Sequence, residues 1–163
     1  MINLSKSLRS VAVFVVVSAW VGGAAAAQDT MLTLTNSITG AEILLTEDGV
    51  MGLDQVTMST TNEFVDEMTV FSGPLARDVV ALLGGGAGDA VVLTAVNDYS
   101  IEVPVQDFID YDVVFAHSTD GERLSMRDKG PIWVVYPMSD NPELRDPTYN
   151  ARLIWQLVSV EIK

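Results

Sequence analysis

The sequence contains no cysteine and a single histidine, His117. Without cysteine the chain has no disulfide, and it has no thiolate for nucleophilic catalysis, for an iron–sulfur cluster or for a cysteine-ligated metal. One histidine excludes a histidine-rich metal site and any relay between two histidines. The fold must therefore be stabilised by its apolar core, without the covalent links common in small exported domains.

Positive charge is also scarce. Nine Lys and Arg residues stand against 22 Asp and Glu residues, which gives a net charge of −13. Two of the nine, Lys6 and Arg9, belong to the N-terminal leader, and without them the net charge is −15. A surface of this sign repels the phosphates of nucleic acids and anionic lipid headgroups. We therefore expect no nucleic-acid partner and no attachment to anionic membranes.

The N-terminus has the pattern of a secretory signal peptide. Lys6 and Arg9 precede the apolar run VAVFVVVSAWVGG, and the AAAA before Gln28 offers a small-residue cleavage site. The apolar run is shorter than the ~20 residues that a membrane span needs, which disfavours the alternative of an uncleaved anchor. We expect cleavage of residues 1–27, no insertion of the mature chain into a membrane, and one domain over 28–163.

The mature chain is expected to form an α+β domain that is mostly β. Apolar–polar alternation and β-rich composition predict strands at 31–36, 41–46, 56–61, 67–71, 90–96, 99–105, 112–118, 122–126 and 131–137. The period becomes helical over 74–83, before glycines 84–86 that would end a helix rather than cradle a phosphate. Helical turns are expected at 106–111 and at the start of 148–163, which leads into a last strand, whereas 139–147 is expected to be a loop.

Cations and aromatic rings gather in the C-terminal third of the chain. Five of the seven cations outside the leader lie between 123 and 152, among the rings of Trp133, Tyr136, Tyr149 and Trp155. Guanidinium groups beside flat rings suit a planar heterocycle, which they bind by stacking and cation–π contacts. The alternatives are internal ion pairs with the acidic N-terminal part and rings that only fill the core. No nucleophile elbow or calcium loop appears.

The order and spacing of four segments are informative about the fold. They are FSGPLARDVVALLG (71–84), AVNDYSIEVPVQDF (95–108), VVFAHSTDGERLSMRDKGPIWVVYP (113–137) and YNARLIWQLVSVEI (149–162). Together they resemble the molybdopterin-binding oxidoreductase domain, the sulfite oxidase fold. The resemblance implies a single domain of this fold, with mixed sheets and few short helices.

The chain departs from that family at the redox centre. Enzymes of the family bind molybdenum through a cysteine thiolate, and the matching position here is about Thr60, whose hydroxyl does not replace a soft thiolate. Trp133 stands where the family often has an arginine. The chain therefore resembles the small, cysteine-free, exported members of the family, some of which are implicated as periplasmic pterin-binding proteins.

This resemblance implies a function in the periplasm. The ligand would be a reduced pterin, with no molybdenum cofactor and no metal, and its presence would be reported to the periplasmic sensor domain of an inner-membrane signalling protein, such as a cyclic-di-GMP enzyme or a histidine kinase. One alternative is a molybdopterin-dependent oxidoreductase with atypical metal ligation. Another is a ligand-free adaptor that keeps the fold as a scaffold.

The same resemblance places the expected pterin site in four stretches of the chain, with no catalytic residue among them. For each residue the alternative is a role in a turn, the core or the surface. The expected ligand-binding residues are Thr60, Thr61, Asn62 and Phe64, then Asn97, Asp98 and Tyr99, then His117, Arg127, Lys129 and Trp133, and finally Tyr149, Asn150 and Arg152.

Overall fold

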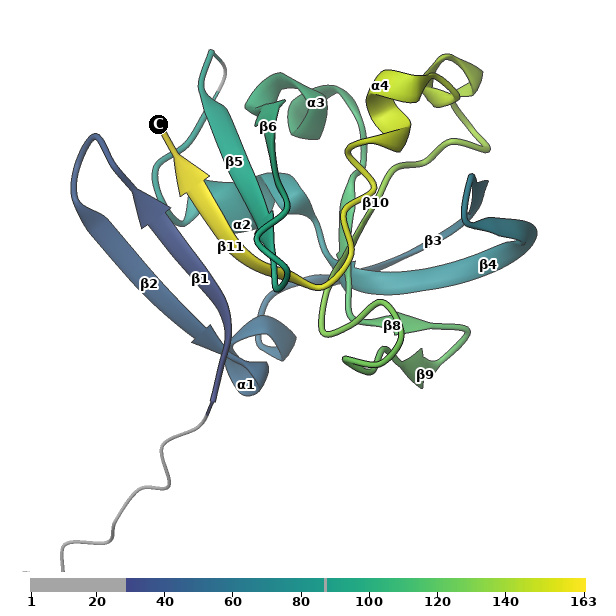
Figure 1. Ribbon diagram of the computed structural model, residues 1–163, viewed down its shortest axis with the longest axis horizontal. Coiled ribbons are helices and arrows are strands. Elements are labelled where there is room, and N and C mark those ends of the chain that lie inside the picture. Colours follow the sequence, from purple (N-terminus) through teal and green to yellow (C-terminus); the bar gives the residue numbers. More distant parts are fainter. Residues whose placement is uncertain (1–28, 87) are drawn as a thin grey trace, which may run out of the picture.

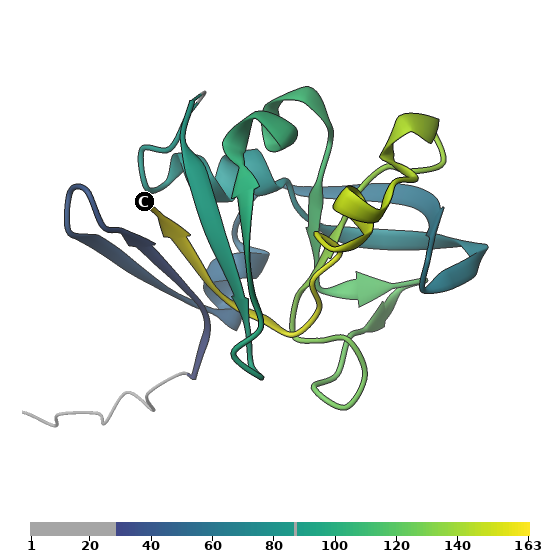
Figure 2. The ribbon, with the colours of Figure 1, turned by 45° about the horizontal axis from the view of Figure 1, so that its top comes forward.

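The computed structural model describes residues 29–86 and 88–163 (Figure 1). The predicted signal peptide, 1–27, lies outside these residues. Within the described part of the chain no helix is both long enough and apolar enough to cross a membrane. The five-stranded sheet and the β3–β4 hairpin lie at opposite ends of the long dimension of the molecule (Figures 1 and 2).

The larger sheet has five strands in the order β2-β1-β11-β5-β6. These are β1 (Thr30–Asn36), β2 (Ala41–Thr46), β5 (Ala90–Ala95), β6 (Ser100–Pro104) and β11 (Leu157–Ile162). All neighbours pair antiparallel except β1 and β11, which are parallel, so the sheet is mixed. The alternating residues Leu32 and Leu34 of β1 are buried, as the period-two pattern predicts.

A second sheet has the order β3-β4-β8-β9. Its strands are β3 (Gln55–Asn62), β4 (Val65–Pro74), β8 (Ser118–Thr119) and β9 (Glu122–Arg123), and a separate pair joins β7 (Val114–Ala116) to β10 (Trp133–Val135). β4 runs to Pro74, three residues beyond the strand predicted at 67–71. Gly73 allows this, because a Cβ at that position would lie 2.0 Å from the carbonyl oxygen of Phe115.

The helices are short, as predicted. They are α1 (Glu47–Met51), α2 (Ala76–Ala81), α3 (Val105–Asp110) and α4 (Pro147–Asn150), with a 3-10 helix η1 (Pro142–Leu144). The helix expected at 74–83 starts later, because Pro74 still pairs with Gln55 in the sheet. Gly84 follows that helix with a positive φ of 76°, which suits glycine. The loop expected at 139–147 was wrong where η1 forms, with Pro142 at its first position.

Strand β10 separates two apolar clusters. Ile132, Val134 and Tyr136 pack into the larger cluster against the five-stranded sheet and α2–α3, whereas Trp133 and Val135 pack into a smaller cluster with Phe71. Successive side chains of a strand point to opposite faces, so both faces of this strand are covered. The prediction that 131–137 is buried on both sides is confirmed.

Candidate functional site

Three chain segments enclose a pocket of 290 Å³ beside the β3–β4 turn, which we call the aromatic pocket. One segment is that turn, the second is the β5–β6 turn, and the third is the stretch 150–155 that leads into β11. The lining residues are Phe64, Ala95, Asn97, Tyr99, Asn150, Ala151, Leu153, Ile154 and Trp155. Pockets that bind small molecules are typically apolar with a few polar groups, and this lining follows that pattern.

Asparagine side chains shape both turns. The Asn62 carboxamide oxygen accepts a hydrogen bond from the Phe64 N–H at 2.8 Å, and the Asn97 oxygen accepts one from the Tyr99 N–H at 3.2 Å. Such side-chain to backbone bonds mimic a turn and hold the next residues in place. Asp98, between Asn97 and Tyr99, adopts a positive φ of 65°. The two turns thereby present Phe64 and Tyr99 to the pocket.

Three partly exposed rings form the walls of the aromatic pocket. Phe64, Tyr99 and Trp155 are 39%, 46% and 37% exposed. Phe64 and Trp155 meet edge to face, with ring centroids 4.7 Å apart and planes at 89°. The Tyr99 hydroxyl donates to the Ala151 carbonyl at 3.3 Å, which links the β5–β6 turn to the third segment. Exposed rings around an apolar hollow offer faces and edges on which a flat ligand can stack.

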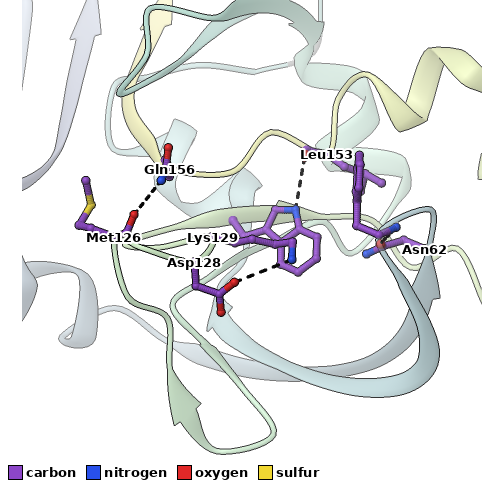
Figure 3. Close-up of polar contacts among 8 residues, drawn as sticks. Asn62, Met126, Asp128, Lys129, Leu153 and Gln156 are labelled. Carbon is purple, nitrogen blue, oxygen red and sulfur yellow. Dashed lines mark hydrogen bonds and ion pairs between the residues drawn. The ribbon is translucent and has the colours of Figure 1, made fainter.

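Asn62 carries a buried donor without a partner. Its amide nitrogen, Nδ2, is inaccessible to solvent and has no hydrogen-bond acceptor among the described residues. Asn62 (Figure 3) is the last residue of β3 and lies two residues before Phe64, which lines the aromatic pocket. An unsatisfied buried donor costs about 1–3 kcal/mol, so this group is a candidate for contact with a ligand or water.

A buried ionic cluster anchors the third segment. Arg152 forms an ion pair with Asp107 of α3, and the Tyr136 hydroxyl donates to the same carboxylate at 3.0 Å. The Arg152 guanidinium also lies 5.0 Å from the ring centre of Tyr149. Burial, followed by the neighbouring carboxylate, raises the pKa of Tyr136 well above its usual value, which keeps this hydroxyl a donor. The cluster fixes the chain next to Ala151 and Leu153.

The structure brings together part of the predicted site. Phe64, Asn97, Tyr99 and Asn150 line the aromatic pocket, and Asn62 and Asp98 shape its turns. The cations take other positions. Arg152 and Tyr149 belong to the buried cluster, Arg127 is exposed, and neither Arg127 nor Lys129 lines the pocket.

Trp133 lies in the core rather than in a wall. Its side chain is 1% exposed, its ring meets that of Phe71 edge to face at 5.3 Å, and its indole nitrogen donates to the Leu153 carbonyl at 3.3 Å. Lys129 covers the ring at 4.9 Å and lies 4.0 Å from Asp128 (Figure 3). Trp133 therefore contacts the aromatic pocket only indirectly, through its hydrogen bond to Leu153, which lines the pocket.

Thr60 and Thr61 are held away from the aromatic pocket by Ser139. The Ser139 N–H donates to the Thr60 hydroxyl at 3.0 Å, and the Thr61 N–H donates to the Ser139 hydroxyl at 2.9 Å. Arg145 donates to the Thr61 hydroxyl at 2.6 Å. These contacts fasten the end of β3 to the 137–141 segment, which is a structural role.

His117 also lies apart from the aromatic pocket. Its Nε2 atom is 2.9 Å from the Gln55 carboxamide oxygen, and the residue is 8% exposed. Burial, with Arg123 nearby, lowers the pKa of His117 below its ordinary value of 6.5. The folded state therefore binds a proton less readily than the unfolded state.

We expect this depressed pKa to make the fold less stable in mild acid. As the pH falls through the unfolded value of 6.5, the unfolded chain takes up a proton that the folded chain resists, so the free energy of unfolding decreases. In urea titrations from about pH 7.5 to about pH 5.5, the wild type should lose more stability than His117→Gln. Equal losses in both proteins would show that His117 titrates normally in the fold.

Comparisons with known proteins bear on the fold. No protein-family model matches the chain, and no curated protein matches it in sequence. Among solved structures, the sulfane dehydrogenase SoxCD from Paracoccus pantotrophus is similar, with a TM-score of 0.62 and 14% sequence identity. The similarity covers 83% of this chain and 38% of that chain. At this identity the likeness shows the fold alone.

The fold is sulfite-oxidase-like. The predicted fold class, α+β and mostly β with mixed sheets and few short helices, is thereby confirmed. The matched region is less than half of the neighbour, so this chain spans only part of that protein's length.

The residues present do not fit the cysteine-ligated molybdenum centre that the family resemblance implies. The chain has no cysteine, and Thr60, at the expected ligand position, is fully buried with its hydroxyl bonded to Ser139. Among the described residues no group of three or more His, Cys, Asp or Glu side chains is arranged to hold a metal ion. Soft thiolate ligation of molybdenum is therefore not available here.

Proposed function

We propose that the protein is an exported pterin-binding protein that works in the periplasm without molybdenum. In this proposal a reduced pterin occupies the aromatic pocket. The observation that carries it is the convergence of three rings and two asparagines, from three separate segments, on one hollow of 290 Å³. This volume is close to the ~300 Å³ lower end of known ligand pockets, which suits a small bicyclic ring.

A pterin is flat and has hydrogen-bond donors and acceptors along one edge. Phe64 and Trp155 offer ring surfaces for its faces, and the Asn97 and Asn150 amides offer both donors and acceptors for its edge. The proposal is thus supported by the chemistry of the lining as well as by the volume of the pocket.

The lining of the aromatic pocket indicates which pterins are favoured. None of its lining residues is charged. A phosphate attached to the ligand would find no cation in the lining, while the rest of the chain carries an excess of acids. We therefore propose a neutral, unphosphorylated pterin in place of the complete molybdopterin.

The signalling role remains part of the proposal and is supported by the charge. The net charge of −15 outside the leader would favour a partner with a basic face, such as the periplasmic sensor domain of an inner-membrane cyclic-di-GMP enzyme or histidine kinase. Binding of the ligand at the tip of the β3–β4 hairpin would alter a surface that such a partner can read.

Purification and titration test the ligand. The full chain would be expressed with its own leader, recovered from the periplasmic fraction, and examined for a fluorescent pterin by extraction. The purified protein would then be titrated with a reduced, unphosphorylated pterin and with a pterin phosphate of the same ring. We expect tighter binding of the unphosphorylated compound. If neither compound binds and no pterin is extracted, the proposal is wrong, and stoichiometric molybdenum would favour the oxidoreductase instead.

A further inference from the structure

A second hollow runs along the outer edge of β3, and we call it the edge groove. It has a volume of 780 Å³ and lies between β3, the end of α3 and the 137–141 segment. Its lining residues are Val56, Thr57, Met58, Ser59, Met68, Leu75, Asp110, Tyr111, Asp112, Val114, Pro137, Ser139, Asp140 and Asn141. Four consecutive residues of one strand border it, so the strand backbone is part of its wall.

The backbone groups of Thr57 and Ser59 point into the edge groove. Thr57 is paired with Ser72 of β4, whose carbonyl accepts from the His117 N–H at 2.9 Å on the far side of β4. In antiparallel pairs both residues direct their backbone groups either toward each other or away from each other. The backbone groups of Ser72 therefore point toward β8, and those of Thr57 point outward from the free edge of β3.

The next outward pair gives the same result. Ser59 is paired with Val70, whose carbonyl accepts from the Asp120 N–H at 2.8 Å, again on the far side of β4. β3 is the terminal strand of its sheet, so these outward groups have no strand beside them among the described residues. Natural edge strands are usually short or protected by Lys or Pro, and β3 is eight residues long with neither.

The groove is covered at one end only. The Ser139 hydroxyl accepts from the Thr61 N–H and so occupies the edge position beyond Ser59. No comparable contact protects Thr57 or Ser59 among the described residues. The structure thus leaves room for an added strand over the N-terminal part of β3.

The charge of the edge groove identifies the partner's chemistry. Three carboxylates line it, those of Asp110, Asp112 and Asp140, and no Lys or Arg is among the lining residues. Arg77, just outside, pairs with Asp112 at 2.6 Å, which leaves the charges of Asp110 and Asp140 for a partner. Val56 and Leu75 add apolar surface to the groove. The strand of a partner could therefore carry apolar side chains that alternate with basic ones.

We propose that the edge groove binds an extended segment of a partner protein that carries Lys or Arg, by adding a strand to β3. Main-chain hydrogen bonds to Thr57 and Ser59 would supply affinity, and the carboxylates would select basic side chains. A second copy of this chain is disfavoured, because its net charge of the same sign would repel it. The proposal does not depend on pterin binding, although Phe64, at the tip of the same hairpin, lines the aromatic pocket.

Peptide binding tests the proposal on the mature chain, residues 28–163, purified with no pterin added. The probe is a short synthetic peptide in which Lys alternates with Val, compared with a peptide in which Glu replaces Lys, and with the Lys peptide N-methylated at alternate amides. We expect binding of the first peptide only, because the second has the wrong charge and the third cannot complete the strand pairing. Absence of binding by the Lys peptide, or equal binding by the methylated peptide, would overturn the proposal.

Protein variants locate the contact. Thr57→Pro removes one outward N–H without removing a bond to β4, and we expect roughly fivefold weaker binding or more. Asp110→Asn with Asp140→Asn should weaken binding about fivefold at low salt and less at high salt. The matched control, Glu42→Gln with Glu102→Gln, removes two charges from the other sheet and should leave affinity unchanged.

The remaining outcomes are also decisive. Equal effects of the two double variants would show that net charge alone attracts the peptide, which contradicts a specific groove. A wild-type dimer in sedimentation that Thr57→Pro dissociates would assign the edge to a second copy and overturn the proposal. If Thr57→Pro does not fold, judged by circular dichroism, the methylated peptide still decides the question on the wild-type protein.

Discussion

Replacing Asp107 with alanine is expected to lower the free energy of unfolding by about 3 to 5 kcal/mol. The Asp107 carboxylate is the shared partner of the Arg152 guanidinium and the Tyr136 hydroxyl. The Asp107 and Arg152 side chains are only 11% and 14% exposed, and Tyr136 is fully buried. Without the carboxylate, a cation and a hydroxyl would remain buried and unsatisfied, which is far more costly than losing a surface pair.

Urea denaturation followed by circular dichroism measures this loss. Asp112→Ala is the matched control, because it removes the partner of Arg77 from an ion pair whose side chains are 37% and 70% exposed. That control should cost no more than about 1 kcal/mol. Asp107→Asn keeps an acceptor for the Tyr136 hydroxyl, so its loss of unfolding free energy should lie between those of Asp107→Ala and Asp112→Ala. If Asp107→Ala and Asp112→Ala are equally mild, the cluster is not an anchor.

The importance of Asp107 could not be predicted from the sequence. It is one of 22 acids in an acidic chain, and its partner Arg152 lies 45 residues away. Local patterns predict strands, turns and helix ends because their signals are repeated over neighbouring residues. An ion pair between distant residues has no such signal and depends on how α3 and the 150–155 segment pack.

The predicted turn residues lie closer to the aromatic pocket than the predicted cations do. Asn62, Asn97 and Asp98 have residue types that favour turns, and they do shape the two turns that present Phe64 and Tyr99 to the aromatic pocket. Whether a ligand uses these turns stays a prediction.

Arg127 and Trp133 are close in sequence but lie in different surroundings, because Arg127 is exposed whereas Trp133 is buried with Lys129 over its ring. The chain turns at 125–130, where the Ser125 carbonyl accepts from both the Asp128 and Gly130 N–H groups. In a strand that is apolar on both faces, the sequence does not indicate which face a given side chain takes. Trp133 faces the smaller cluster, and the tryptophan that lines the aromatic pocket is Trp155.

Trp155 should therefore matter more for ligand binding than any cation of the 123–152 stretch. If a pterin occupies the aromatic pocket, Trp155→Ala is expected to weaken its binding about thirtyfold or more, which corresponds to about 2 kcal/mol of lost stacking and apolar contact. Trp155 is 37% exposed, so its removal should disturb the fold little. Fluorescence titration with a reduced, unphosphorylated pterin gives the affinity, and thermal unfolding checks the fold.

Arg127→Ala is the control that separates the two possible positions of the ligand. Arg127 is exposed and lies outside the lining of the aromatic pocket, so its replacement should leave the affinity for an uncharged pterin unchanged. The opposite pattern, in which Arg127→Ala weakens binding and Trp155→Ala does not, would place the ligand on the 125–130 turn. A large loss in both variants would mean that the ligand extends from the pocket to this turn, and a charged substituent would then be required to explain the part played by Arg127.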